Sequence, residues 1–211
     1  MSKLQEVATA LELGKQKEIE ALVQAALDEG LAPQDVLNTM ISSMGNIGDK
    51  FQRNEVFVPE MLVAALTMKK GVAILQPMLA ATGGAASLGT CVIGTVMGDL
   101  HDVGKNLVAL MIESAGFKVV DIGVDAPPEK FVEAALAHDD CNIVAVSALL
   151  TTTMEAMKLT VEALIKAGVQ PKAKILVGGA PVTQEFADSI GADGYSPDAG
   201  SAATKAKELI A

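Results

Sequence analysis

The sequence predicts an α/β protein, in which an N-terminal four-helix bundle is followed by a five-stranded parallel sheet with helices on both faces. Two observations predict it. Apolar residues in the first 80 or so positions recur at three- and four-residue steps, which is the period of amphipathic helices. From Thr90 onward, short runs rich in Val and Ile alternate with helix-like segments, and this alternation is typical of crossover connections between parallel strands.

Four helices are predicted in the N-terminal part of the chain. They lie at about 2–13, 16–29, 33–53 and 59–79. Ser2 can cap the first helix, and Gly30 suits the position that follows the second. Pro33 and Pro59 stand where the third and fourth begin, because proline is favoured in a first helical turn. Helices of this length with short connections indicate a small antiparallel bundle.

Residues 80–89 are small and uncharged, which predicts a flexible linker between two domains. We place the domain boundary inside this segment, because the period of the apolar residues changes on either side of it. This gives a helical domain at 1–84 and an α/β domain at 85–211.

The second domain is expected to contain five strands that alternate with helices. The strands are expected at 90–96, 118–122, 143–147, 174–177 and 194–195. The helices are expected at 106–114, 128–137, 154–167 and 182–190, with a last helix that follows the fifth strand and extends to about 210. Gly116 and Gly168 follow two of these helices, at the position where a left-handed residue ends a helix. In a flavodoxin-like or Rossmann-like sheet of strand order 2-1-3-4-5, a ligand binds beyond the carboxyl ends of strands one and three.

Charge and composition exclude several classes of protein. The net charge of −10 opposes nucleic-acid binding, which needs a cationic face, and the absence of Trp leaves few side chains for base stacking. No apolar run approaches the roughly 20 residues of a membrane span, and the first residues lack the pattern of a signal peptide. With only two cysteines, Cys91 and Cys141, we expect a cytoplasmic protein in which both are core residues.

Residues 98–104, Gly-Asp-Leu-His-Asp-Val-Gly, join the first predicted strand to the next helix. Asp99 and His101 can form a carboxylate–imidazole pair, which fixes the tautomer of a histidine and raises its basicity as a metal ligand. Gly104 removes the side chain where a large flat ligand could approach the backbone. The segments Ser147–Thr153 and Gly178–Gly179 end two further strands and should face the same crevice.

Several common ligands do not match these residues. The glycines after the first strand lack the Gly-x-Gly-x-x-Gly spacing of dinucleotide sites, and residues 104–106 lack the hydroxyl of a P-loop. A phospho-receiver domain would need Asp in place of Ser147. A zinc hydrolase needs about three ligands, whereas His138 is expected to be a solvated residue at a helix end. A single histidine offered to a metal indicates that an organic ring supplies most of the coordination.

Three elements together resemble the signature of cobalamin-binding proteins. They are Asp99-x-His101-x-x-Gly104, Ser147-x-Leu149 and Gly178-Gly179, and the intervals between them are close to the family's spacing. Phe57-Val-Pro-Glu-Met61, which leads a helix rich in Met and Ala, resembles the cap module of methyltransferase corrinoid proteins. The likeness is closest to the stand-alone corrinoid proteins of methanol, methylamine, glycine betaine and methoxyaromatic methyltransferase systems, and to the cobalamin module of methionine synthase.

The resemblance implies a role for each matching residue. His101 would bind cobalt as the lower axial ligand in place of the cofactor's own benzimidazole (the His-on, base-off mode), with Asp99 and Thr153 as its relay. Other cofactor-binding residues of the α/β domain would be Asp102, Val103, Gly104, Ser147, Leu149, Thr151, Gly178 and Gly179, of which the last five would line a slot for the nucleotide tail. In the helical domain, Phe57, Met61, Leu62 and Ala65 would cover the reactive face of the corrin.

The resemblance also implies a function. The protein would carry a methyl group on cobalt, cycling between Co(I) and methyl-Co(III), from a substrate-specific methyltransferase to an acceptor-side methyltransferase, with a corrinoid-reactivating reductase as a further partner. Nothing in the crevice resembles substrate-activating machinery, so we expect a carrier subunit and not a complete enzyme. Three alternatives stay open: a cobalamin-dependent sensor or regulator, a mutase small subunit, and a bundle fused to a flavodoxin-like module with another ligand.

Overall fold

The computed structural model describes residues 2–81 and 87–211. It divides into two compact units, a helical one made chiefly of residues up to Leu88 and an α/β one that begins at Gly89. The expected boundary between residues 84 and 85, and half of the expected linker, fall on 82–86 and so lie outside the described residues.

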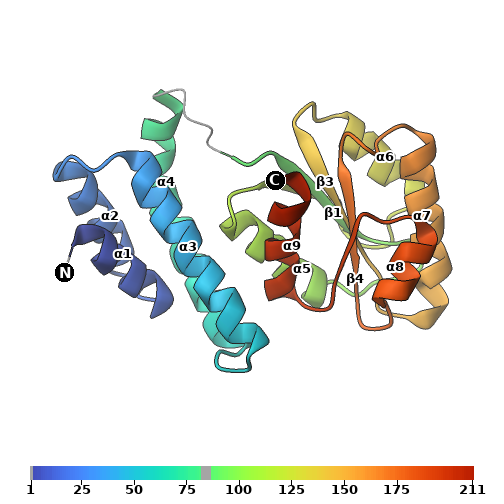
Figure 1. Ribbon diagram of the computed structural model, residues 1–211, viewed down its shortest axis with the longest axis horizontal. Helices are drawn as coiled ribbons and strands as arrows, with labels where there is room; N and C mark the ends of the chain where they lie inside the picture. Colours follow the sequence, from blue (N-terminus) through green and yellow to red (C-terminus); the bar gives the residue numbers. More distant parts are fainter. Residues whose placement is uncertain (1, 82–86) are drawn as a thin grey trace. The chain divides into compact units, whose positions relative to one another are not determined.

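The described residues of the helical unit form the helices α1 to α4 (Figure 1). They are α1 (Lys3–Glu12), α2 (Ile19–Asp28), α3 (Pro33–Gln52) and α4 (Val58–Ala81). Ser2 caps α1 by accepting a hydrogen bond from the backbone N–H of Gln5. The prediction that α2 begins at residue 16 is wrong, because the chain first makes a turn in which Glu18 N–H donates to the carbonyl of Lys15.

Gly71 of α4 lies where side chains of α2 and α3 pack closely against this helix. A Cβ atom built on Gly71 would lie 2.4 Å from the Cε atom of Met40 on α3 and 3.2 Å from Ile19 on α2. Met40 and Ile19 are both fully buried, so the methyl group of an alanine would displace core side chains. The core of this unit also contains Leu11, Met61, Met68, Leu75 and Leu79.

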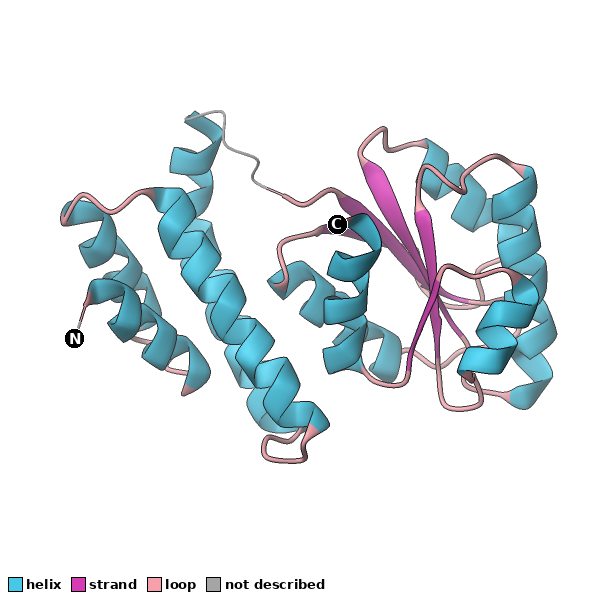
Figure 2. Ribbon diagram, in the orientation of Figure 1, coloured by secondary structure: helices cyan, strands magenta, loops and turns pink. Residues whose placement is uncertain are grey.

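The α/β unit is a parallel sheet with helices on both faces (Figure 2). Its strands are β1 (Thr90–Thr95), β2 (Lys118–Asp121), β3 (Cys141–Ser147), β4 (Lys174–Gly178) and β5 (Gly194–Ser196). The strand order β2-β1-β3-β4-β5 confirms the flavodoxin-like order expected from the sequence. The helices are α5 (Val103–Ser114), α6 (Pro128–Leu136), α7 (Met154–Lys166), α8 (Gln184–Ile190) and α9 (Ala199–Ile210). Helices α5 and α9 cover one face, and α6, α7 and α8 cover the other (Figure 1).

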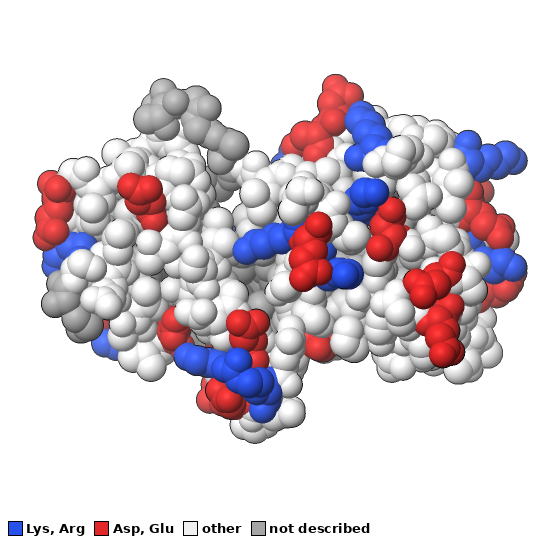
Figure 3. Space-filling model, in the orientation of Figure 1, with Lys and Arg blue, Asp and Glu red and all other residues white. Residues whose placement is uncertain are grey.

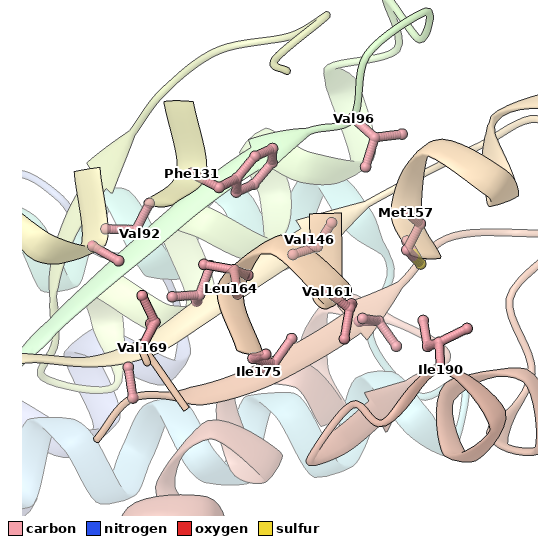
Figure 4. Close-up of a cluster of buried hydrophobic side chains, with 14 of the residues drawn as sticks. Val92, Val96, Phe131, Val146, Met157, Val161, Leu164, Val169, Ile175 and Ile190 are labelled. Atoms are coloured by element: carbon pink, nitrogen blue, oxygen red, sulfur yellow. The ribbon is translucent and has the colours of Figure 1, made fainter. Parts of the chain in front are cut away.

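The core under α6, α7 and α8 is a cluster of mainly aliphatic side chains that includes the ring of Phe131 (Figure 4). Phe131 from α6 is fully buried between this helix and β1, and Leu164 of α7 packs in the same cluster. Cys91 and Cys141 are also buried and free, which confirms that both are core residues. Burial raises the pKa of both thiols, so they stay protonated at neutral pH.

The register of the strands brings three chain segments to one edge of the sheet. Thr95 pairs with Ser147, and Ser147 pairs with Gly178 on the next strand. The segments that follow β1, β3 and β4 therefore leave the sheet side by side, as the strand order predicts. Two helices near this edge differ from prediction: α5 begins three residues earlier, at Val103, and α8 begins at Gln184 with Thr183 as its cap.

The surface carries charges of both signs. On the face shown in Figure 3, Lys and Arg side chains lie among Asp and Glu side chains and do not form a continuous basic surface. Within residues 2–81 and 87–211, no helix combines the length and the apolar character needed to cross a membrane.

Candidate functional site

The site is built around a histidine that is oriented by a buried carboxylate. His101 lies in the segment between β1 and α5, and its Nδ1 atom is 2.6 Å from Oδ1 of Asp99. The backbone N–H of His101 donates to the same oxygen at 3.1 Å. The Asp99 side chain is fully buried, whereas half of the His101 side chain is exposed. The pair therefore leaves Nε2 as the imidazole nitrogen that can bind a metal.

The second oxygen of Asp99 joins this segment to the one that follows β3. Its Oδ2 atom accepts a hydrogen bond from the backbone N–H of Leu149 at 2.7 Å and one from the Thr153 hydroxyl at 2.9 Å. Thr153 closes a 3-10 turn, Thr151–Thr153, directly before α7. The structure thus brings together Asp99, His101, Leu149 and Thr153, four of the residues singled out from the sequence.

These contacts determine the charge of Asp99. Burial by itself raises the pKa of this carboxyl group, but hydrogen bonds from Leu149, His101 and Thr153 outweigh burial and lower the pKa to about 2. Asp99 is therefore ionised at neutral pH. An ionised carboxylate beside Nδ1 keeps a proton on that nitrogen, which leaves the lone pair of Nε2 for a ligand.

The lowered pKa predicts a dependence of stability on pH. The Asp99 carboxylate stabilises the folded state above the ordinary pKa of 3.8, and this contribution is lost as the pH falls through about 2. Wild type should therefore lose about 2 kcal/mol more of its unfolding free energy between pH 5 and pH 2 than Asp99→Asn does. Urea unfolding of the cofactor-free proteins across this range measures the difference. Parallel curves for the two proteins would contradict the ionised, hydrogen-bonded state of Asp99.

Gly178 is the last residue of β4, and Gly179 follows it at the same edge of the sheet. A Cβ atom on Gly179 would lie 1.8 Å from the carbonyl oxygen of Ala148, and φ of Gly179 is +132°, which side chains rarely tolerate. A Cβ atom on Gly178 would lie 2.8 Å from the carbonyl oxygen of Ser196. Neighbouring backbone therefore requires glycine at both positions, independently of any slot for a nucleotide tail.

The remaining predicted residues of this unit lie in the segments that leave the sheet at the same edge. Asp102 lies directly before α5, and its carbonyl accepts the N–H of Asn106, which explains the early start of this helix. Gly104 is open, since an added Cβ atom would meet nothing within 4 Å. The side chains of Thr151 and Leu149 are exposed, and that of Ser147 is half-buried.

Large apolar side chains are exposed around His101, and sequence reasoning alone misses most of them. They are Met97, Leu100, Val103, Leu149 and Leu150, of which Leu100 and Val103 are the most exposed, at 73% and 81%. Exposed apolar side chains in such proximity commonly mark a surface that a ligand or partner covers. The signal that could have found them is the presence of apolar residues between the polar residues of the site.

Lys105 does not face a ligand. This residue of the first turn of α5 is buried, and its Nζ atom forms an ion pair with Oδ2 of Asp121 at the end of β2. It also donates to Oδ1 of Asn106 at 2.7 Å. A lysine that is paired inside the protein cannot neutralise a bound phosphate, in agreement with the missing P-loop pattern.

The cap residues implied by the resemblance fall into two groups. Phe57 is 63% exposed and Leu62 is 37% exposed, so both retain surface for a ligand. Met61 and Ala65 are fully buried. In this conformation Met61 and Ala65 have no exposed surface, and their expected role in covering a corrin stays a prediction.

The fold and the site define a class of protein, an α/β protein with one carboxylate-oriented histidine at the edge of its parallel sheet where ligands of such folds bind. Comparison with known proteins is more specific. Residues 89–204 match a family model described as a B12 binding domain, and residues 3–76 match a second model with the same description.

The chain is also similar to curated proteins over nearly its whole length. It is 41% identical over 209 residues to the dimethylamine corrinoid protein of Methanosarcina barkeri, covering 99% of this chain and 97% of the relative. It is 43% identical to the trimethylamine corrinoid protein of the same organism, covering 90% of this chain and 88% of the relative. The chain belongs to the B12-binding family and, within it, to the corrinoid proteins of methyltransferase systems.

Solved structures agree with this assignment. A cobalamin-binding protein from Desulfitobacterium hafniense DCB-2 has a TM-score of 0.83 at 27% identity, covering 99% of this chain and 98% of that one. A chain of the methanol:cobalamin methyltransferase complex of Methanosarcina barkeri has a TM-score of 0.83 at 28% identity, covering 99% of this chain and 79% of that one. The cofactor of the family is cobalamin or a related corrinoid.

The residues of the α/β unit fit such a cofactor. A corrin ring supplies four nitrogens to its cobalt and leaves a position for a further ligand, and the half-exposed imidazole of His101, held by Asp99, would suit that position. The apolar side chains around His101 suit the largely apolar face of the ring, and the open space at Gly104 lets a flat group approach the backbone.

Proposed function

We propose that this protein is a cytoplasmic methyl carrier, whose bound corrinoid receives a methyl group from one methyltransferase and gives it to another. The observation that carries the proposal is the half-exposed imidazole of His101, oriented by a fully buried and ionised Asp99. A bound corrinoid would supply the methyl-transfer chemistry, with Co(I) and methyl-Co(III) as its expected states. The protein's own part is to bind, orient and shield the cofactor.

The residues divide this work among them. His101 would ligate the cobalt from below in the His-on mode, while Asp99 keeps the proton on Nδ1 and Thr153 holds Asp99 in place. The tail slot would be lined by Ser147, Leu149, Thr151, Gly178 and Gly179. Of the cap residues, Phe57 and Leu62 keep exposed surface with which to cover the corrin and exclude water.

The partners follow from the carrier role. A substrate-specific methyltransferase would load the cofactor, an acceptor-side methyltransferase would unload it, and a reductase would restore oxidised cobalt. The similar structure from a methanol:cobalamin methyltransferase complex supports the first of these partners. The relatives named for dimethylamine and trimethylamine make a methylated amine the first donor class to test.

The test is reconstitution of the full chain with methylcobalamin, followed by gel filtration. We expect cofactor to stay with the protein at a ratio near one, with an absorption spectrum of the His-on form, and to stabilise the protein against heat because ligand binds only the folded state. Loss of all cofactor on the column would contradict the proposal. A parallel sample with adenosylcobalamin separates the carrier from a sensor or mutase subunit, since clear preference for the adenosyl form would favour those alternatives.

A further inference from the structure

His101 is also held through its backbone. Thr95, the last residue of β1, is fully buried, and its hydroxyl donates a hydrogen bond to the carbonyl oxygen of His101 at 2.9 Å. The backbone N–H and carbonyl groups of Thr95 form hydrogen bonds with other residues. Its N–H donates to the carbonyl of Gly123, and its carbonyl accepts the N–H of Ala126. The backbone of Thr95 is thus held in the sheet, and its side chain binds the segment that carries His101.

A second residue outside the predicted site holds the start of the same segment. The carboxylate of Asp125, in the connection between β2 and α6, accepts the backbone N–H of Gly98 at 2.7 Å. The N–H of Asp125 donates to the carbonyl oxygen of Asp99 at 3.0 Å. Asp125 makes these contacts with φ at +50°, a conformation that few residues other than glycine adopt. Such a conformation persists where surrounding structure enforces it.

We propose that Thr95 and Asp125 are positioning residues that brace the backbone of residues 98–101, so that the position of the His101 imidazole depends on these contacts as well as on Asp99. Asp99 orients the imidazole ring of His101 through a hydrogen bond, whereas Thr95 and Asp125 form hydrogen bonds with backbone groups of residues 98–101. This inference rests on the proposed function of His101 as axial ligand. It goes beyond that function, because the two residues match no part of the motif and act on the backbone of the segment.

The experiment compares isosteric and conservative variants at Thr95 in protein loaded with methylcobalamin. Thr95→Val keeps the shape of the side chain but removes the donor, and Thr95→Ser keeps the donor. We expect the base-off fraction in the absorption spectrum to rise at least about threefold in Thr95→Val, since a modest loss of free energy shifts an equilibrium by such factors. Thr95→Ser should restore the wild-type spectrum. Electron paramagnetic resonance of the Co(II) form measures the axial nitrogen independently.

Asp125 supplies a second pair that does not depend on a buried position. Asp125→Ala removes the acceptor for Gly98 N–H at an exposed site, and Asp125→Asn retains an acceptor oxygen. We expect a higher base-off fraction in the alanine variant and rescue by asparagine. If Thr95→Val fails to fold, the two Asp125 variants still test whether hydrogen bonds to the backbone of residues 98–101 affect the base-off fraction.

The outcomes are distinguishable from failure of the proposed function. Wild type that retains corrinoid without a His-on spectrum would overturn the axial role of His101 itself. Wild type in the His-on form, together with folded Thr95→Val and Asp125→Ala proteins whose spectra equal it, would overturn the brace alone. A spectral change that neither conservative variant rescues would also overturn it, because that change would then not arise from the two hydrogen bonds.

Discussion

His101→Ala is expected to convert bound methylcobalamin completely to the base-off form and to weaken its retention at least about tenfold, since even the loss of a partner of a metal ligand costs this much. The fold should survive. The His101 side chain is half-exposed, and Asp99 keeps hydrogen bonds from Leu149 N–H and the Thr153 hydroxyl after the imidazole is removed. Absorption spectra before and after gel filtration measure ligation and retention in one experiment.

His138→Ala is the matched control. His138 is the other histidine of the chain and lies in the turn between α6 and β3, where its carbonyl accepts the N–H of Cys141. This backbone contact does not need the imidazole, so the variant should bind methylcobalamin with the wild-type spectrum. A base-off spectrum in His138→Ala together with an unchanged one in His101→Ala would reverse the assignment of the ligand.

Gly179→Ala is expected to destabilise the α/β unit strongly. The new methyl group would lie 1.8 Å from the carbonyl oxygen of Ala148 in a conformation with φ of +132°. Both the contact and the dihedral angle must relax, and such combined strain costs on the order of 4 kcal/mol. Either poor expression or a lower urea midpoint with unchanged slope would be the measured result.

Gly104→Ala is the matched control for this substitution. Gly104 lies in the first turn of α5, and an added Cβ atom would meet nothing within 4 Å. Alanine in a helix is favoured over glycine by up to about 1 kcal/mol, so this variant should be as stable as wild type or slightly more stable. Equal stability of the Gly179 and Gly104 variants would contradict the close backbone approach at the end of β4.

Local patterns allowed much of the fold to be predicted. The apolar runs at β1 to β4 and the alternation with helices depend on periodicity, which is visible in a single sequence, and the flavodoxin-like order was confirmed. Element ends were predicted less well. Gly104 favoured a loop, yet the hydrogen bond from Asn106 N–H to Asp102 allows α5 to begin at Val103.

The contacts of the site also include some that the sequence could predict and some that it could not. Asp99 and His101 are two residues apart, so their pairing could be predicted from spacing. The contacts of Asp99 with Leu149 N–H and of Gly98 N–H with Asp125 involve backbone groups, which every residue other than proline can supply. Residue type carries no signal for such contacts. The need for glycine at position 179 likewise depends on where the chain brings Ala148, which only the folded arrangement shows.

The carboxylate of Asp99 has a consequence for protein engineering. One of its oxygens is hydrogen-bonded to the segment after β1, and the other accepts hydrogen bonds from the segment after β3. Grafting only residues 98–104 onto another parallel-sheet scaffold would therefore bury a negative charge without two of its donors. The two segments form a single transplantable module, and a recipient scaffold must present both strand ends in the register that pairs Thr95 with Ser147.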